Sequence, residues 1–286
     1  HLLPGDGETI GAQLTADPRV AGVCFTGSTQ VAKIINRALA EKDGPIPVLI
    51  AETGGLNGMF VDTTALREQV MDDVVSSAFN AAGQRCSALR ILFLPEATAE
   101  HIIAGLKGAM DSLVIDHPGR VKTDVGPVID CEALQNLQTY VANLPEGMSV
   151  LKQCYIPGAL EAGYYMPPTL IEANDLSGFD REHFGPLLHV VRYKPKTLDA
   201  LMSEFASKGF GLTLGIHSRL DDFAKQVTDA VPAGNVYINR NIIGAVVGVQ
   251  PFGGCGLSGT GPKAGGPHYL ARFATEVTVT NNITAQ

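Results

Sequence analysis

The sequence predicts an α/β fold, because short apolar segments alternate with helix-like segments along most of the 286 residues. Residues 20–25 and 45–51 are apolar runs bounded by turn residues, as buried strands are. The segment between them begins with Ser28 or Thr29 as the N-cap, and its apolar side chains have the spacing of one helix face. A strand, a helix and a second strand in this order are typical of a parallel sheet.

The same alternation continues toward the carboxyl terminus. We expect further strands at residues 58–61, 89–94, 165–171, 187–193, 213–217 and 236–239, and helices at 65–82, 96–113, 131–144, 198–207 and 220–230. Residues 116–127 and the glycine-rich residues 244–266 are expected to be irregular. Residues 276–280 alternate like an exposed strand, which can pair with another chain. The opening residues, HLLPGDG, have the composition of a turn inside a domain, so we expect the chain to begin partway through a fold.

The composition argues against several classes of function. A net charge of −8 disfavours a nucleic-acid binder, which needs a basic surface, and leaves small molecules or other proteins as partners. The sequence contains neither a membrane-length apolar run nor a signal-peptide pattern at its start, so we expect a cytoplasmic protein. Five cysteines without a CxxC pair indicate neither a disulfide framework nor a metal site.

The turn at residues 25–28, FTGS, joins a predicted strand to a predicted helix. The unpaired N–H groups at the start of a helix favour a phosphate ligand. Because the turn lacks the GxGxxG pattern, an ordinary strand-to-helix connection explains it as well. Glu52 also follows a predicted buried strand, and ligands of open α/β sheets gather at such strand ends. An exposed carboxylate at a sheet edge is the alternative interpretation.

Cys86, in the segment GQRCSALR, is the candidate nucleophile. It is predicted to lie in a loop, where the neighbouring Arg85 would favour a thiolate. Cys24 lies inside an apolar strand and is expected to be buried and structural, whereas Cys255 in a glycine-rich loop is a competing nucleophile. The histidines are expected to be ordinary surface or core residues, so a thiol with a carboxylate base, and not a Cys–His pair, favours covalent catalysis on a carbonyl. Cys131 and Cys154 have no polar neighbours that suggest a role.

Five motifs occur in a fixed order: FTGS, ETGG at 52–55, GQRC at 83–86, EHFGP at 182–186, and PFGG with LSG at 251–259. In this order and spacing they resemble the NAD(P)-dependent aldehyde dehydrogenase superfamily. GQRCSALR, ETGG and residues 259–269 are most similar to the glutamate-semialdehyde (Δ1-pyrroline-5-carboxylate) dehydrogenases, including the dehydrogenase module of bifunctional proline utilization A proteins.

The resemblance implies a role for each matched residue. Cys86 would attack the aldehyde, hydride would pass to NAD+, and water activated by Glu52 would hydrolyse the thioester. It implies that the pyrophosphate binds at Ser28, the nicotinamide ribose at Glu182 and the nicotinamide near Phe184. The full set of implied cofactor contacts is Thr26, Gly27, Ser28, Thr53, Gly54, Glu182 and Phe184. It also implies substrate contacts: Ser87, Gly265 and Gly266 would anchor the substrate carboxylate, and Phe252 would form an aromatic wall.

The resemblance covers the carboxyl-terminal part of the family. It implies the end of a Rossmann-type NAD-binding domain at residues 1–53, an α/β catalytic domain at 54–270 and an oligomerisation arm at 271–286. Matches to the first half of the NAD-binding domain, to the oxyanion asparagine and to the adenosine-ribose lysine are missing, so we expect these residues alone to be inactive. EHFGP stands where EIFGP is more usual.

The resemblance also implies partners: a small aldehyde substrate, a homodimer or larger assembly, and a proline dehydrogenase module on the same parent chain. Two alternatives stay open. The first is another semialdehyde dehydrogenase or a CoA-acylating one, although Glu52 as a base for water and the GPKAGG loop as a carboxylate anchor disfavour it. The second is a non-catalytic oligomerising fragment.

Overall fold

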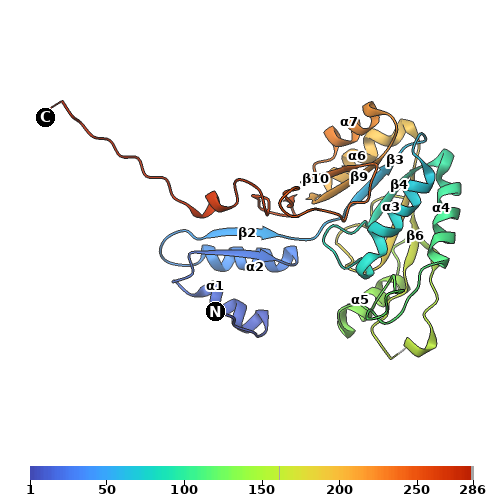
Figure 1. The fold of residues 1–286 in the computed structure, drawn as a ribbon, viewed down its shortest axis with the longest axis horizontal. Coiled ribbons are helices and arrows are strands. Elements are labelled where there is room, and N and C mark those ends of the chain that lie inside the picture. Colours follow the sequence, from blue (N-terminus) through green and yellow to red (C-terminus); the bar gives the residue numbers. More distant parts are fainter. Residues whose placement is uncertain (161, 285–286) are drawn as a thin grey trace.

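The computed structural model describes residues 1–160 and 162–284, which form two lobes of unequal size (Figure 1). The smaller lobe contains a helical turn Gly7–Gly11, α1 Ala12–Ala16, β1 Gly22–Thr26, α2 Thr29–Ala40 and β2 Val48–Glu52. Strands β1 and β2 are parallel neighbours, so the predicted strand–helix–strand unit is confirmed. Ser28 caps α2, because its hydroxyl accepts a hydrogen bond of 3.2 Å from the Val31 amide. The sequence pattern gives no indication of the helices between Gly7 and Ala16.

The larger lobe is built on a seven-stranded sheet in the order β10-β9-β3-β4-β7-β6-β5. All neighbouring pairs are parallel except β5 with β6 at one edge. The strands are β3 Gly58–Val61, β4 Ile91–Pro95, β5 Met148–Gln153, β6 Thr169–Ala173, β7 Leu187–Tyr193, β9 Thr213–His217 and β10 Asn235–Ile238. The helices are α3 Arg67–Phe79, α4 Glu96–Asp111, α5 Cys131–Ala142, α6 Leu198–Ser207 and α7 Asp221–Ala230. This arrangement confirms the α/β fold class.

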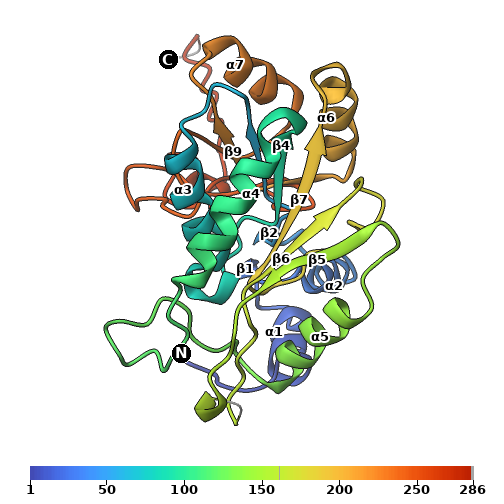
Figure 2. The same cartoon turned by 90° about the vertical axis from the view of Figure 1, so that its right-hand side faces the viewer.

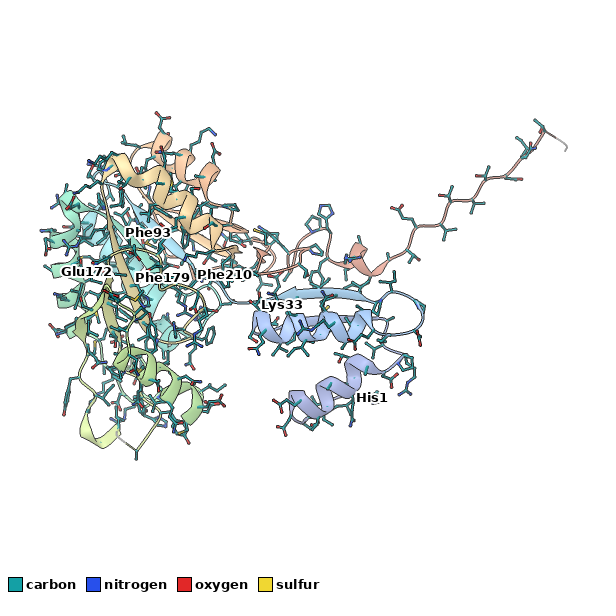
Figure 3. All side chains as sticks on the ribbon, turned by 180° about the vertical axis from the view of Figure 1, so that it is seen from behind. His1, Lys33, Phe93, Glu172, Phe179 and Phe210 are labelled. Atoms are coloured by element: carbon teal, nitrogen blue, oxygen red, sulfur yellow. The ribbon has the colours of Figure 1, made fainter. Side chains whose placement is uncertain are left out.

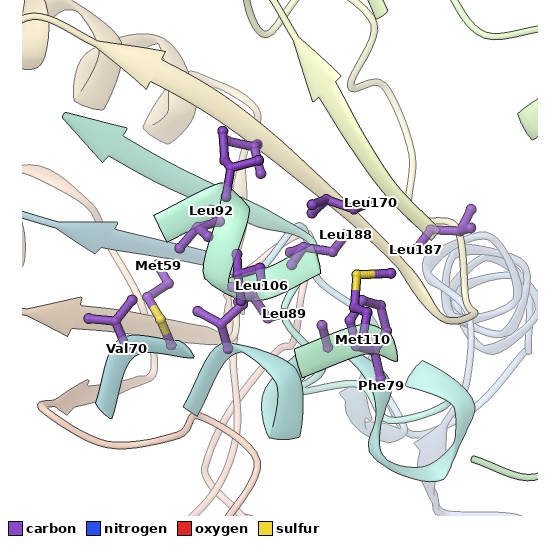
Figure 4. Close-up of a cluster of buried hydrophobic side chains, with 14 of the residues drawn as sticks. Met59, Val70, Phe79, Leu89, Leu92, Leu106, Met110, Leu170, Leu187 and Leu188 are labelled. Carbon is purple, nitrogen blue, oxygen red and sulfur yellow. The ribbon is translucent and has the colours of Figure 1, made fainter. Parts of the chain in front are cut away.

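Helices cover both faces of the large sheet (Figure 2). Alternate strand residues point to opposite faces, so Met59 of β3 joins one core while its neighbour Phe60 joins the other. The first core packs against α3, α4 and α5, and Figure 4 shows its side chains between the strands and helices. In the second core Phe60 stacks on Phe93 at a centroid distance of 4.2 Å, with Phe205 of α6 edge-on to both.

Two predicted elements differ from the structure, and one observed strand was not predicted. The strand expected at 165–171 is displaced to β6, because Pro167 and Pro168 have no N–H group to give to a ladder. The helix expected at 65–82 ends at Phe79, where a short turn Asn80–Gly83 takes over. The edge strand β5 does not appear among the expected strands, since its residues are partly polar and half-exposed.

The carboxyl-terminal residues leave the larger lobe and return to the smaller one. Short strand β11 Cys255–Gly256 pairs with β8 Phe210–Gly211, and a helical turn Leu270–Phe273 follows. From Ala274 the described chain extends away from both lobes (Figure 1), and Val277 and Val279 are 82% and 84% exposed. The strand expected at 276–280 therefore has no neighbour among the described residues. No helix among those residues has both the length and the apolar character needed to cross a membrane.

The environment of Cys24 differs from the prediction. Cys24 lies in β1 as expected, but it is exposed, and its sulfur is 3.4 Å from the Tyr269 hydroxyl. The sheet of the smaller lobe has two strands, and none of the five residues of β1 is fully buried. The expected burial of Cys24 was therefore wrong.

Candidate functional site

A cavity of about 840 Å³ lies where the two lobes meet. Figure 3 shows Lys33 at the end of α2 nearest the larger lobe and Phe210 on the side of the larger lobe that faces it. Both residues line the cavity. The predicted site residues that also line it are Thr26, Gly27, Ser28, Glu52, Thr53, Gly54, Cys86, Glu182, Phe184 and Phe252. The fold thus brings together the predicted nucleophile, the predicted base and the predicted cofactor contacts.

Glu52 lies at the carboxyl end of β2 and is held by the glycine-rich segment that returns from the larger lobe. Its Oε2 accepts a hydrogen bond of 2.8 Å from the Gly254 amide, while its Oε1 is buried without a hydrogen-bond partner among the described residues. A Cβ atom at Gly253 would lie 2.7 Å from Oε1, so a side chain at this position would displace the Glu52 carboxylate. Burial raises the pKa of Glu52 to about 7, against the lowering effects of the Gly254 amide and Lys263.

The Cys86 loop follows the turn that ends α3. Ala81, Ala82 and Gly83 all have positive φ angles of 54–65°, which reverses the chain direction. A Cβ at Gly83 would overlap the carbonyl of Gly185, so this glycine lets the loop approach the EHFGP segment. Asn57 holds the other side, because its side-chain amide donates to the carbonyls of Cys86 and Ala88 at 2.7 and 2.8 Å.

The protonation of Cys86 differs from what its neighbour in the sequence suggested. Arg85 is exposed, and its guanidinium points to the carbonyl of Ile243 at 3.4 Å. The pKa of Cys86 is raised, first by burial and then by the negative charge of Glu182. The expectation that Arg85 favours the thiolate is therefore wrong, because the Arg85 guanidinium contacts the carbonyl of Ile243 while the Cys86 thiol is largely buried near the negative charge of Glu182.

Glu182 and Phe184 enter the cavity from the EHFGP segment, which runs into β7. A Cβ at Gly54 would overlap the Glu182 carboxylate, so this carboxylate lies directly against the backbone of the ETGG segment. Arg90 pairs with Glu182 at 2.9 Å, and both side chains are largely buried. Burial raises the pKa of Glu182, and the charge of Arg90 opposes this rise.

Sequence reasoning missed Arg90, Asn57 and Lys33 as neighbours of the site. Arg90 was part of the quoted GQRCSALR segment, and a charged residue directly before a buried apolar strand was a usable signal. Asn57 similarly precedes the buried strand β3. Lys33 follows the helix N-terminus by one turn, and nothing in the pattern distinguishes it from other surface lysines.

The amino end of α2 faces the same cavity. Thr26, Gly27 and Ser28 lead from β1 into this helix and line the cavity wall. The first N–H groups of a helix have no partners inside it, and the helix dipole places partial positive charge there. The wall therefore suits an anionic group.

The predicted substrate residues are less closely gathered. Phe252 lines the cavity and forms an isolated bridge with Ala264, which places Gly265 and Gly266 next in the chain. Ser87 is buried at 6% exposure, and its carbonyl accepts a hydrogen bond from Thr213. Cys255, the competing nucleophile, belongs to β11, where its sulfur lies 3.6 Å from the carbonyl of Gly211.

Curated relatives with similar sequences include the bifunctional protein PutA of Escherichia coli (strain K12), which is 52% identical over 282 residues. This match covers 96% of the chain and 21% of that protein. The 1-pyrroline-5-carboxylate dehydrogenase of Bacillus thuringiensis (strain Al Hakam) is 34% identical, with 95% of the chain and 53% of that protein covered. The chain thus spans about a fifth and about half of the lengths of these two relatives.

Solved structures give the same result. Proline utilization A (PutA) of Bradyrhizobium japonicum, as the D779Y mutant, superposes with a TM-score of 0.92 at 56% identity, covering 96% of this chain and 28% of that one. The 1-pyrroline-5-carboxylate dehydrogenase from Thermus with bound NAD superposes with a TM-score of 0.87 at 33% identity, covering 95% and 52%. The model of the aldehyde dehydrogenase family matches residues 1–279, and the chain belongs to this family.

Proposed function

We propose that these residues are the carboxyl-terminal part of an enzyme that oxidises L-glutamate γ-semialdehyde to L-glutamate with NAD+, a step of proline breakdown. One observation carries the proposal: Cys86 and Glu52, a thiol and a base with a pKa of about 7, line the same cavity. Relatives named PutA and 1-pyrroline-5-carboxylate dehydrogenase, at 52% and 34% identity, favour this substrate over other aldehydes.

The residues around the cavity fit a dinucleotide. The amino end of α2, with Thr26, Gly27 and Ser28, suits a pyrophosphate. Glu182 would accept hydrogen bonds from the nicotinamide ribose, with Phe184 against the nicotinamide and Thr53 and Gly54 on the opposite wall. When bound, NAD+ supplies the hydride acceptor.

The chain's own residues supply the covalent chemistry. Because its pKa is raised, Cys86 rests as a thiol, and its proton passes to solvent as the sulfur adds to the aldehyde carbon. A C–S bond forms and the carbonyl oxygen takes the negative charge. Loss of hydride from that carbon leaves a thioester on Cys86. Glu52 then accepts a proton from water, the hydroxide adds to the thioester, and the C–S bond breaks to release the carboxylate and the thiolate. The buried Oε1 of Glu52 has no hydrogen-bond partner among the described residues, which suits this role.

The substrate's own carboxylate would bind on the Phe252 side of the cavity. Phe252 would form an aromatic wall, and the backbone amides of Gly265 and Gly266 would approach the carboxylate without obstruction by side chains. Ser87 would support this region from a buried position. A CoA-acylating reaction is disfavoured, because Glu52 offers a base that would activate water to hydrolyse the thioester.

We propose the same domain organisation as the resemblance implies. Residues 1–53 would complete an NAD-binding domain, residues 54–270 would form the catalytic domain, and residues 271–286 an arm for a homodimer or larger assembly. The separate two-stranded and seven-stranded sheets support the first boundary, and the exposed Val277 and Val279 support the arm. The name of the relative, bifunctional protein PutA, favours a second catalytic module, proline dehydrogenase, on the parent chain. We place the parent protein in the cytoplasm.

The substrate assignment is tested by comparing two aldehydes of equal chain length, glutamate semialdehyde and its analogue without the far carboxylate, in the parent enzyme. Losing a charge-assisted hydrogen bond costs about 1.5–3 kcal/mol, so we expect kcat/KM to fall about tenfold to a hundredfold for the analogue. Equal kcat/KM values would contradict the substrate while leaving the family membership intact. Residues 1–286 alone should show no turnover, because the adenosine end of the cofactor lacks half of its binding domain.

A further inference from the structure

Arg90 connects two segments of the site through one side chain. Its Nε and Nη2 donate to Oε1 of Glu182 at 3.2 and 2.9 Å, and its Nη1 donates to the carbonyl of Gly185 at 2.9 Å. Nη2 also donates to the carbonyl of Arg85, the residue before Cys86, at 3.3 Å. The guanidinium carbon lies 5.4 Å from the centre of the Phe184 ring. One guanidinium thus contacts both the EHFGP segment and the Cys86 loop.

The base of this side chain is fixed to the centre of the large sheet. The Arg90 amide donates to the carbonyl of Asn57 at 3.0 Å, and its carbonyl accepts from the amide of His189 at 2.9 Å. These bonds join it to the residue before β3 and to the third residue of β7. At 2% exposure Arg90 is removed from solvent, so it has little freedom to move. Its guanidinium is therefore a rigid reference point for the two loops.

A buried ion pair is a costly way to join two loops, because both charges lose their hydration. A neutral side chain of similar volume would fill the same space without that cost. It would lack the planar set of N–H donors with which the guanidinium holds one carboxylate oxygen and two carbonyl oxygens. The arrangement therefore indicates a requirement for orientation and charge beyond simple packing.

We propose that Arg90 is a positioning residue that holds the Glu182 carboxylate ionised and oriented toward the cofactor while it fixes the Cys86 loop at a set distance from it. This inference rests on the proposed binding of NAD+ at Glu182. Arg90 is outside the residues that line the cavity, so it acts through Glu182 and through the loop carbonyl. Loss of Arg90 should weaken cofactor binding more than aldehyde binding.

The chain offers a matched control. Arg192 on β7 bonds Glu172 of β6 and Glu100 of α4, and is thus a second arginine between two segments. Its side chain is 28% exposed and lies outside the residues that line the cavity. Arg192→Met removes two Arg–Glu pairs without touching the site, so it shows what the loss of such pairs does to the fold alone.

The experiment measures NAD+ affinity by calorimetry and steady-state kinetics in the parent enzyme, for Arg90→Met, Arg90→Lys, Glu182→Gln, Arg90→Met with Glu182→Gln, and Arg192→Met. Because Arg90→Met removes charge-assisted contacts, we expect Kd and KM for NAD+ to rise about tenfold or more in this variant. KM for the aldehyde should stay within about twofold of its original value. Arg90→Lys should restore part of the affinity, since it keeps the charge but loses the fork.

Two further readouts separate positioning from general support. In Arg90→Met the affinity for NAD+ should fall as pH is lowered, because an unpaired, buried Glu182 takes up a proton at higher pH than before. In the Glu182→Gln background, adding Arg90→Met should change Kd by less than about twofold, since the two residues act as one unit. Arg192→Met should leave Kd unchanged.

The proposal is overturned if Arg90→Met raises both KM values equally, if the two substitutions add fully, or if Arg192→Met has the same effect. Should Arg90→Met fail to fold, Arg90→Lys and Glu182→Gln decide the question: unchanged NAD+ affinity in both overturns it. Calorimetry with NAD+ does not depend on the aldehyde, so a wrong substrate assignment leaves this test intact. Absence of NAD+ binding in the unsubstituted enzyme would instead overturn the proposed function.

Discussion

The two lobes use the same strand–helix–strand unit but differ in how their sheets are covered. In the larger lobe every residue of β3 and β4 is buried, and helices pack on both faces. In the smaller lobe β1 has no fully buried residue, and Val31 and Ile34 of α2 are also exposed. Parallel sheets in proteins are normally covered on both faces, so the two-stranded sheet of the smaller lobe is the less completely covered of the two.

The cavity draws different contributions from the two lobes. The larger lobe contributes Cys86 and Glu182 from loops that are anchored to buried strands. The smaller lobe contributes the amino end of α2 and Glu52. Glu52 belongs to both, since its strand is in the smaller lobe while its carboxylate is held by Gly254. The comparison therefore predicts that residues of the larger lobe carry out the covalent chemistry and that the smaller lobe binds the cofactor phosphates.

The largest expected effect concerns the nucleophile on the larger lobe. In the parent enzyme Cys86→Ala should lower aldehyde oxidation by about a thousandfold or more, because no thiohemiacetal can form. Its Kd for NAD+ should stay within about twofold, since the amino end of α2 is unchanged. Turnover assays beside an NAD+ titration measure both. Cys255→Ala is the matched control and should retain activity; if the control is the inactive variant, the nucleophile has been misplaced.

The second effect concerns Glu52, which lies at the boundary between the lobes. Glu52→Gln should slow thioester hydrolysis about a hundredfold, a loss typical of a removed general base, and leave hydride transfer faster than hydrolysis. Rapid mixing should show a burst of NADH followed by a slow steady state. Equal slowing of both phases would mean that Glu52 acts before hydride transfer.

The pH dependence of the hydrolysis step follows from the same residue. With a pKa of about 7, Glu52 is in its carboxylate form above neutral pH and protonated below it. Only the carboxylate accepts a proton from water, so the steady-state rate should fall as pH drops below about 7. In Glu52→Gln this dependence should disappear, which separates it from any titration of Cys86.

Much of the fold was predictable because buried strands and amphipathic helices have strong local patterns. The strands at 58–61, 187–193 and 213–217 and the helix at 198–207 match their predicted bounds. Family motifs located the residues of the cavity in the same way. In each case neighbouring residues in the sequence carry the signal.

The features that were missed depend on contacts between distant residues. Helix α3 ends at Phe79 because Gly83 must pass close to Gly185, which lies far away in the sequence. Arg90 gains its meaning from Glu182, 92 residues later. Cys24 is exposed, which the sequence did not predict. A short apolar run does not reveal whether other elements cover the strand. Such contacts are set by the assembled fold, and the local pattern at most marks a residue as unusual, as the charge of Arg90 before a buried strand does.

The third effect tests the comparison of the lobes directly. In residues 1–286, amides of β1 and β2 should exchange with solvent about tenfold or more faster than those of β4 and β7, because partly covered elements open more readily than a fully buried sheet. Hydrogen exchange followed by mass spectrometry measures this for each segment. Similar protection in both sheets would show that the smaller lobe is as stable as the larger one.

The smallest effect is confined to the larger lobe, at the histidine of EHFGP. His183 stacks on Tyr140 of α5 at a centroid distance of 3.6 Å, and the Tyr140 hydroxyl is 2.9 Å from Nε2 of His189. His183→Ile, which restores the more usual EIFGP, should lower the free energy of unfolding by about 0.5–1.5 kcal/mol through loss of the stack. Tyr140→Phe is the matched control, because it keeps the stack and removes the hydroxyl.

The pH dependence distinguishes a neutral stack from a charged one. Burial lowers the pKa of His183 to about 4, below its ordinary value of 6.5, so the folded protein holds this ring neutral where the unfolded chain would protonate it. The stability that depends on the neutral ring is complete above about pH 6.5 and is lost as pH falls toward 4. In His183→Ile that contribution to the acid sensitivity should vanish, while NAD+ affinity in the parent enzyme stays within about twofold, because the stack faces α5 and not the smaller lobe. Thermal unfolding from pH 4 to 8 measures the first point; an unchanged acid sensitivity would show that His183 is already protonated in the folded state.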